Sequence, residues 1–112
     1  MAQLALNRFK TETIVLTTSD QTIYTAPTGY TGIVLYAHVT NVASSSSAAS
    51  FTMSHVRSST TTEIVKDASV PVSDAYIPLD GKLVLQTNDS VKASAGANSS
   101  LKVLLSVLET AN

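Results

Sequence analysis

Turn signals divide the chain into runs of about the length of β-strands, and their spacing constrains the fold more than any other feature. Pro27 and Gly29 end one run, and the pair Asp80-Gly81 precedes another, since proline and glycine favour the backbone angles of tight turns. Such signals recur about every 8–12 residues, and no run sustains a helical period. We therefore expect one all-β domain of about eight strands, an antiparallel β-sandwich or jelly roll. The expected strands cover residues 14–16, 22–25, 33–42, 51–57, 62–67, 82–87, 90–95 and 101–108.

Two of these runs carry apolar residues on both faces. In the final run, Leu101, Val103, Leu105 and Val107 alternate and should face the core. An outer strand face is usually polar when one side of a sheet meets water. Apolar residues on the outer faces of these two runs therefore predict either a subunit interface or a cover formed by another part of the same chain. The residues concerned are Val34, Tyr36, Leu104 and Leu108.

Residues 1–12 lack a turn or cap, and we expect them to form an extended arm in front of a β-sandwich domain at 13–112. Leu4, Leu6 and Phe9 are the apolar residues of this arm. It could add a strand to the sheet edge of a neighbouring subunit. Alternatively, it could pack on its own domain and cover Leu104 and Leu108.

The sequence contains no pattern that predicts catalysis, a cofactor or nucleic-acid binding. It has no cysteine, so it has no thiolate nucleophile, and its acidic residues are dispersed rather than paired. It lacks a serine nucleophile elbow and a glycine-rich phosphate loop. The basic residues are spread along the chain, no apolar run is long enough to span a membrane, and the first residues do not read as a secretory signal. We predict a protein that is not an enzyme.

The two histidines could face each other if the Ser/Ala-rich loop at 43–49 joins neighbouring strands and turns at Ser46–Ser47. His38 and His55 could then share a zinc ion, but the sequence places no third ligand beside them. We favour a polar cross-strand contact and predict no metal site. The four tyrosines are expected at core edges or interfaces rather than as a platform for sugars or bases.

The low content of charged residues favours a protein that packs against others. Asp, Glu, Lys and Arg make up 13% of the chain, compared with about 25% in an ordinary globular domain. A sparsely charged surface has less repulsion between copies. The alternative is a small β-domain whose abundant serine and threonine hydroxyls keep it in solution.

Four stretches resemble small virion structural proteins of tailed bacteriophages, notably phages of marine bacteria. They are TIYTAPTGYTGIVL at 22–35, VTNV at 39–42, DGKLVLQTNDSVKASAG at 80–96 and LKVLLSVLE at 101–109, within a resemblance that covers residues 13–109. The resemblance implies a non-enzymatic β-sandwich located in the virion and assembled in the host cytoplasm. The implied partners are the major capsid protein or other virion proteins, and we expect a homo-oligomer such as a trimer.

Within a virion, the sequence favours a capsid decoration (cement) protein on the outer head shell. The short single domain, the low charge, the partly apolar outer faces and the arm fit this role. The alternatives are a small tail, baseplate or fibre subunit and a carbohydrate-binding attachment module. The second alternative is weaker because the chain has few aromatic residues and no tryptophan.

Overall fold

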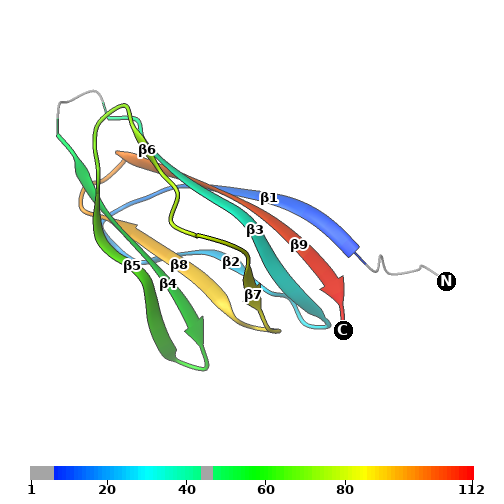
Figure 1. Cartoon of the computed structure of the whole chain (residues 1–112). Coiled ribbons are helices and arrows are strands. Elements are labelled where there is room, and N and C mark those ends of the chain that lie inside the picture. The colour runs from blue at the N-terminus through cyan, green and yellow to red at the C-terminus, as the bar shows by residue number, and fades with distance from the viewer. Residues whose placement is uncertain (1–6, 44–46) are drawn as a thin grey trace.

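The computed structural model describes residues 7–43 and 47–112, and all regular structure in them is β-strand (Figure 1). Within these described residues, nine strands form two antiparallel sheets in a single β-sandwich domain, which confirms the expected fold class. The strands are β1 (Asn7–Val15), β2 (Gln21–Thr25), β3 (Tyr30–Asn41), β4 (Ala49–Arg57), β5 (Thr60–Val70), β6 (Ala75–Tyr76), β7 (Leu83–Leu85), β8 (Ser90–Ala95) and β9 (Leu101–Ala111). The described residues include no helix that could cross a membrane.

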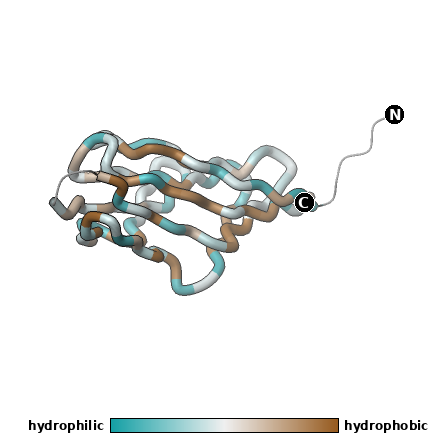
Figure 2. The backbone as a smooth tube through the Cα atoms, turned by 90° about the horizontal axis from the view of Figure 1, so that it is seen from above, coloured by the Kyte–Doolittle hydropathy of each residue, from teal (hydrophilic) through white to brown (hydrophobic). Residues whose placement is uncertain are grey.

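The chain passes back and forth between the two sheets, but β4 and β5 follow each other in one sheet and β6 and β7 follow each other in the other. Sheet A has the order β1-β9-β3-β6, with β7 also paired to β3, and sheet B has the order β2-β8-β4-β5. Apolar and polar segments alternate along the strands in Figure 2, as expected where one face of each sheet is buried. The core lies between the sheets, and its largest apolar side chains with no solvent exposure are Leu16, Phe51, Met53, Leu85, Leu101 and Leu105.

The last strand follows the predicted alternation, but β3 does not. Leu101, Val103, Leu105 and Val107 are all buried, as expected. In β3 the pairing with β9 shifts between Val34 and Tyr36, which is a β-bulge that inserts one extra residue. The bulge exchanges the two faces of the strand. Val34 is therefore fully buried, and its predicted place on the outer face is wrong.

The N-terminal boundary of the domain also differs from the prediction. Strand β1 begins at Asn7 and pairs with β9 along its whole length, from Asn7 opposite Thr110 to Val15 opposite Lys102. Residues 7–12 therefore belong to sheet A rather than to an arm, because their backbone groups find partners on β9. Leu4 and Leu6 lie outside the described residues.

The segments after β3 also differ from the prediction. β6 is the strand missing from the expected set, and it pairs with Val39 and Thr40 of β3. β3 and β4 do not form a hairpin, because β3 lies in sheet A and β4 lies in sheet B. His38 is opposite Leu104, whereas His55 is opposite Val91 and Thr62, so the proposed contact between the two histidines is wrong. Among the described residues, no three His, Asp or Glu side chains could hold a metal ion together.

Candidate assembly surface

The outer face of sheet A is almost free of charge. Every second residue along β1, β9 and β3 points away from the core, apart from the shift at the β3 bulge. These outward residues carry mostly apolar, hydroxyl and amide side chains. Lys102 carries the one formal charge among the described strand residues that point outward from this sheet. A solvated sheet face normally carries polar and charged side chains, so this face has the composition of a surface that another protein covers.

An apolar row crosses one end of this face over four strands. Phe9 of β1 is opposite Leu108 of β9, Leu108 is opposite Ile33 of β3, and Ile33 is opposite Val84 of β7. Phe9 is 76% exposed and Val84 is 54% exposed, while Leu108 and Ile33 are half-buried. We call these four residues the Phe9 row. Cross-strand neighbours of this kind lie close enough to form one continuous apolar ridge.

A second aromatic and apolar group lies nearer the middle of the face. Tyr36 and Leu104 are both partly exposed on the outer side. The Tyr36 ring stacks on the His38 imidazole with 5.9 Å between ring centroids. His38 Nδ1 lies 3.2 Å from the Thr40 hydroxyl oxygen, a hydrogen bond that fixes the ring orientation.

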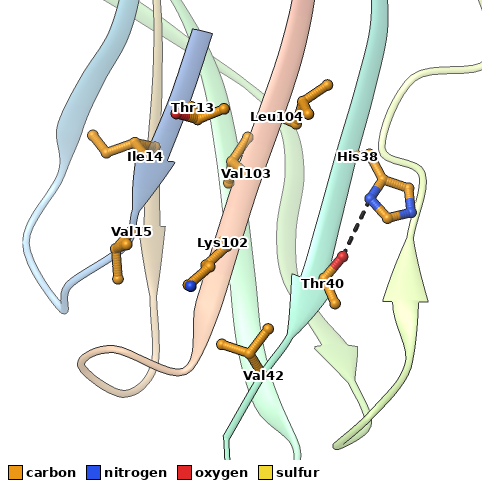
Figure 3. A pocket seen from close by; sticks show the side chains of 9 residues that line it. All are labelled: Thr13, Ile14, Val15, His38, Thr40, Val42, Lys102, Val103 and Leu104. Carbon is orange, nitrogen blue, oxygen red and sulfur yellow. Dashed lines mark hydrogen bonds between the residues drawn. The ribbon is translucent and has the colours of Figure 1, made fainter.

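A groove of about 540 Å³ occupies the other end of the face (Figure 3). Val15 of β1, Leu104 of β9 and Val42 just after β3 supply apolar surface, and Lys102 lies between them. Thr13, Ile14, His38, Thr40 and Val103 complete the lining. The groove thus combines an apolar lining with a single ammonium group.

The outer face of sheet B differs in composition. Its register and burial leave hydroxyl and charged side chains outward, including Thr22, Thr25, Ser50, Thr52, Glu63, Ser90, Lys92 and Ser94. The Thr25 and Ser90 hydroxyl oxygens are 2.8 Å apart and hydrogen-bonded across the strands. This outer face therefore carries more charged and fewer apolar side chains than the outer face of sheet A.

The structure brings together most of the interface residues that the sequence indicated. Phe9, Tyr36, Leu104 and Leu108 share the outer face of sheet A. Ile33 was not predicted, because simple alternation puts it on the face opposite Val34 and Tyr36 and does not reveal the bulge in β3. Val84 was not predicted either, because it belongs to a strand too short to show a clear period.

A buried carboxylate joins the two sheets behind the Phe9 row. Glu109 of β9 is fully buried and accepts a 2.5 Å hydrogen bond from the Tyr24 hydroxyl of β2. Arg8 Nε donates to Glu109 Oε1 at 2.9 Å, and the Arg8 guanidinium lies over the Tyr30 ring, 4.0 Å from its centroid. Gly32 makes room for the Tyr24 ring, since a Cβ atom there would lie 2.9 Å from it.

These contacts shift the pKa values of both Glu109 and Tyr24. Burial alone would raise the pKa of Glu109, but the Tyr24 hydrogen bond, Arg8 and Lys10 together lower it below its ordinary value. Burial and the hydrogen bond to Glu109 raise the pKa of Tyr24 well above its ordinary value. The carboxylate therefore stays charged and the phenol stays protonated at neutral pH.

A second buried carboxylate, Asp89, lies in the turn before β8. Arg57 donates to it from Nε at 3.0 Å and from Nη2 at 2.6 Å. His55 Nε2 lies 3.1 Å from Asp89 Oδ2, and the Gln86 backbone N–H donates to the same oxygen at 3.0 Å. In the described part of the chain no hydroxyl group hydrogen-bonds to His55, so the imidazole lacks the nucleophile of a Ser-His-Asp arrangement. The contacts of Asp89 with His55 and Arg57 link the C-terminal end of β4 to the turn before β8.

Acid should weaken the folded state through Asp89. The Arg57 hydrogen bond, against an opposing effect of burial, lowers the pKa of Asp89 to about 2 from 3.8. A carboxylate whose pKa is lower in the folded state stabilises the fold above its unfolded pKa, and this contribution is lost as the pH falls through the folded pKa. We expect the melting temperature to fall between pH 3.8 and about 2. Thermal unfolding of Asp89→Asn should show a lower melting temperature at pH 7 and a weaker acid dependence; an unchanged acid dependence would contradict this assignment.

Comparisons with known proteins show the fold. No protein-family model matches the sequence, and no curated protein matches it. Among solved structures, the chain is similar to one from the acidic stable capsid of Helicobacter pylori bacteriophage KHP30, with TM-score 0.58, 14% identity and coverage of 95% of this chain and 88% of that chain. It is also similar to a chain of Bacillus endospore appendages, a family of disulfide-linked pili, with TM-score 0.53, 7% identity and coverage of 99% and 96%. A pentameric capsid protein from metagenomic phage sequences matches with TM-score 0.42, 16% identity and coverage of 98% and 64%.

Proposed function

We propose that the chain is a non-enzymatic structural protein of a bacteriophage particle and that the outer face of sheet A is buried against other virion subunits. The observation that carries this proposal is the difference between the two outer faces. One presents the Phe9 row and the apolar groove with a single formal charge, and the other presents hydroxyl and charged groups. The buried centre of a protein–protein interface is depleted in charged residues, so the outer face of sheet A suits contact with another subunit better than the outer face of sheet B does.

The fold comparisons support this role. The KHP30 chain comes from a phage capsid and the Bacillus chain comes from a pilus, so both similar folds occur in large protein assemblies. Both buried carboxylates are also engaged by cations of the same domain, which suits a rigid building block. The resemblance of the sequence to virion proteins of tailed phages points in the same direction.

Within the particle we favour a capsid decoration protein that binds the outer head shell. The domain is small, and its low content of charged residues suits a subunit that packs on a shell formed by the major capsid protein. Residues 1–6 precede β1 directly and contain Leu4 and Leu6, so they could extend the contact by adding a strand to a neighbouring subunit. In this proposal the protein is assembled in the host cytoplasm and resides in the virion.

The alternative is a small subunit of the tail, baseplate or fibre. The similarity to a pilus chain favours this alternative specifically. Those pili are disulfide-linked, whereas this chain has no cysteine, so a fibre built from it would depend on non-covalent contacts. An attachment module that binds carbohydrate has less support, because the aromatic residues of the exposed face do not surround a polar groove.

Copy number in the purified particle tests the proposed function. A decoration protein should be present at a number comparable to that of the major capsid protein, because it covers the repeating shell. A tail or fibre subunit should be present in a far smaller number. Quantitative mass spectrometry of purified virions against labelled peptides measures this ratio. Absence of the chain from the particle would contradict both roles.

A further inference from the structure

We infer that the partner of the sheet A face is a second copy of the chain, related by a two-fold axis, with the Phe9 row of each copy seated in the groove of the other. This inference rests on the proposed assembly role of that face and names the partner. A two-fold contact requires one surface that is complementary to itself. The outer face of sheet A has this property, because a ridge lies at one end and a hollow lies at the other.

The positions of the ridge and the groove define the axis. Leu108 of the ridge and Lys102 of the groove lie on β9, about 20 Å apart along the strand. An axis that lies between two stacked faces and runs across the strands would exchange these two ends. The axis would pass over the middle of each strand, near Ser106, which is opposite Thr11 on β1 and Tyr36 on β3. Each β1 then lies over the β1 of the other copy, so that Phe9 meets Thr13, which lines the groove.

The dimensions of the face suit a stable pair. The three long strands β1, β9 and β3 lie about 4.8 Å apart and are roughly ten residues long, so they give a face of about 490 Å². Standard interfaces bury about 800 Å² per partner, so most of such an interface could come from this face alone. Phe9, with 76% of its surface exposed, is the most exposed large apolar side chain of the described residues. The groove, at about 540 Å³, has room for its ring.

The charges also permit this arrangement. Lys102 of one copy would lie beside the Phe9 ring of the other, where an ammonium group is attracted to the face of an aromatic ring. The two Lys102 groups would lie at opposite ends of the interface, roughly 25 Å apart, which is beyond the range of strong repulsion in physiological salt. No carboxylate on the described outward positions of sheet A strands would be buried without a partner.

A single engineered cysteine tests the position of the axis, because the chain has no native cysteine. We expect purified Ser106→Cys to form a disulfide, or a short bismaleimide cross-link, between two copies in high yield. Ser94→Cys is the matched control, since this serine lies on the outer face of sheet B and should not cross-link above the level of random collision. Equal yields for the two variants would overturn the inference.

Sedimentation equilibrium gives an independent readout. The parent chain should have twice the 11.7 kDa mass of one copy, and Phe9→Ser should sediment as a monomer with an unchanged melting temperature. A monomeric parent would overturn the two-fold pair, and so would a mass three times that of the chain, which would fit the trimer expected from the sequence. Either result would leave the proposed role in the particle intact, because copy number in the virion tests that role separately.

Discussion

We expect Glu109→Ala to lower the free energy of unfolding by about 3 kcal/mol. The substitution removes the acceptor of the Tyr24 hydroxyl and the partner of Arg8. Tyr24 is 5% exposed, so its hydroxyl would lose its hydrogen bond without gaining free access to water. Arg8 is partly exposed and can turn toward solvent, which keeps the loss below that of a fully buried unpaired cation. Urea unfolding followed by circular dichroism measures the change.

Two further variants separate the causes of that loss. Glu109→Gln keeps the size of the side chain and an acceptor oxygen for Tyr24 but removes the charge, so it should cost less than Glu109→Ala. Glu63→Ala is the matched control, because Glu63 is exposed on β5 and its loss should change stability by no more than about 0.5 kcal/mol. If Glu109→Ala were as stable as the Glu63 control, the buried cluster would have no structural role.

The sequence was sufficient to predict the fold because local signals agree with it. Pro27, Gly29 and the Asp80-Gly81 pair mark turns, and the alternation in residues 101–108 matches the burial of β9. The bulge in β3 was not predictable from this alternation, because a single inserted residue leaves apolar residues on both sides of the register shift. Residues 7–12 were predicted to form an arm because the sequence does not show that they pair with β9. Their alternation is weak, and their partner strand lies about 100 residues away in the sequence.

The candidate surface was predictable only in part, because strand pairing between distant segments decides which residues share it. Leu104 and Leu108 were visible as apolar residues on the second face of a clear strand, whereas Ile33 and Val84 join them only through strand pairing. Glu109 appeared in the sequence as one of several dispersed acidic residues. Its partners Arg8 and Tyr24 come from β1 and β2, so their convergence depends on the packing of the two sheets. Contacts between residues that are far apart in the sequence produce no local sequence pattern from which they could be predicted.

A pair of aspartate substitutions should separate the core of the domain from its assembly face. Val34→Asp should abolish folding, because Val34 is fully buried and a carboxylate there would have no partner. We expect a loss of more than about 4 kcal/mol, measured as insoluble expression or as a flat thermal melt. The sequence alone placed Val34 on the outer face, so this result would also test the bulge in β3.

Leu104→Asp should leave folding largely intact and weaken association between subunits. Leu104 is 36% exposed on the outer face of sheet A, so its replacement should change the free energy of unfolding by about 1 kcal/mol or less. The same carboxylate would be desolvated wherever another subunit covers the face, so association should fall by more than tenfold in sedimentation experiments. Thr22→Asp, on the exposed face of sheet B, is the matched control and should affect neither property. If Leu104→Asp associated as tightly as the parent chain, the outer face of sheet A would not be the assembly surface. If Val34→Asp folded normally, the register of β3 would be wrong.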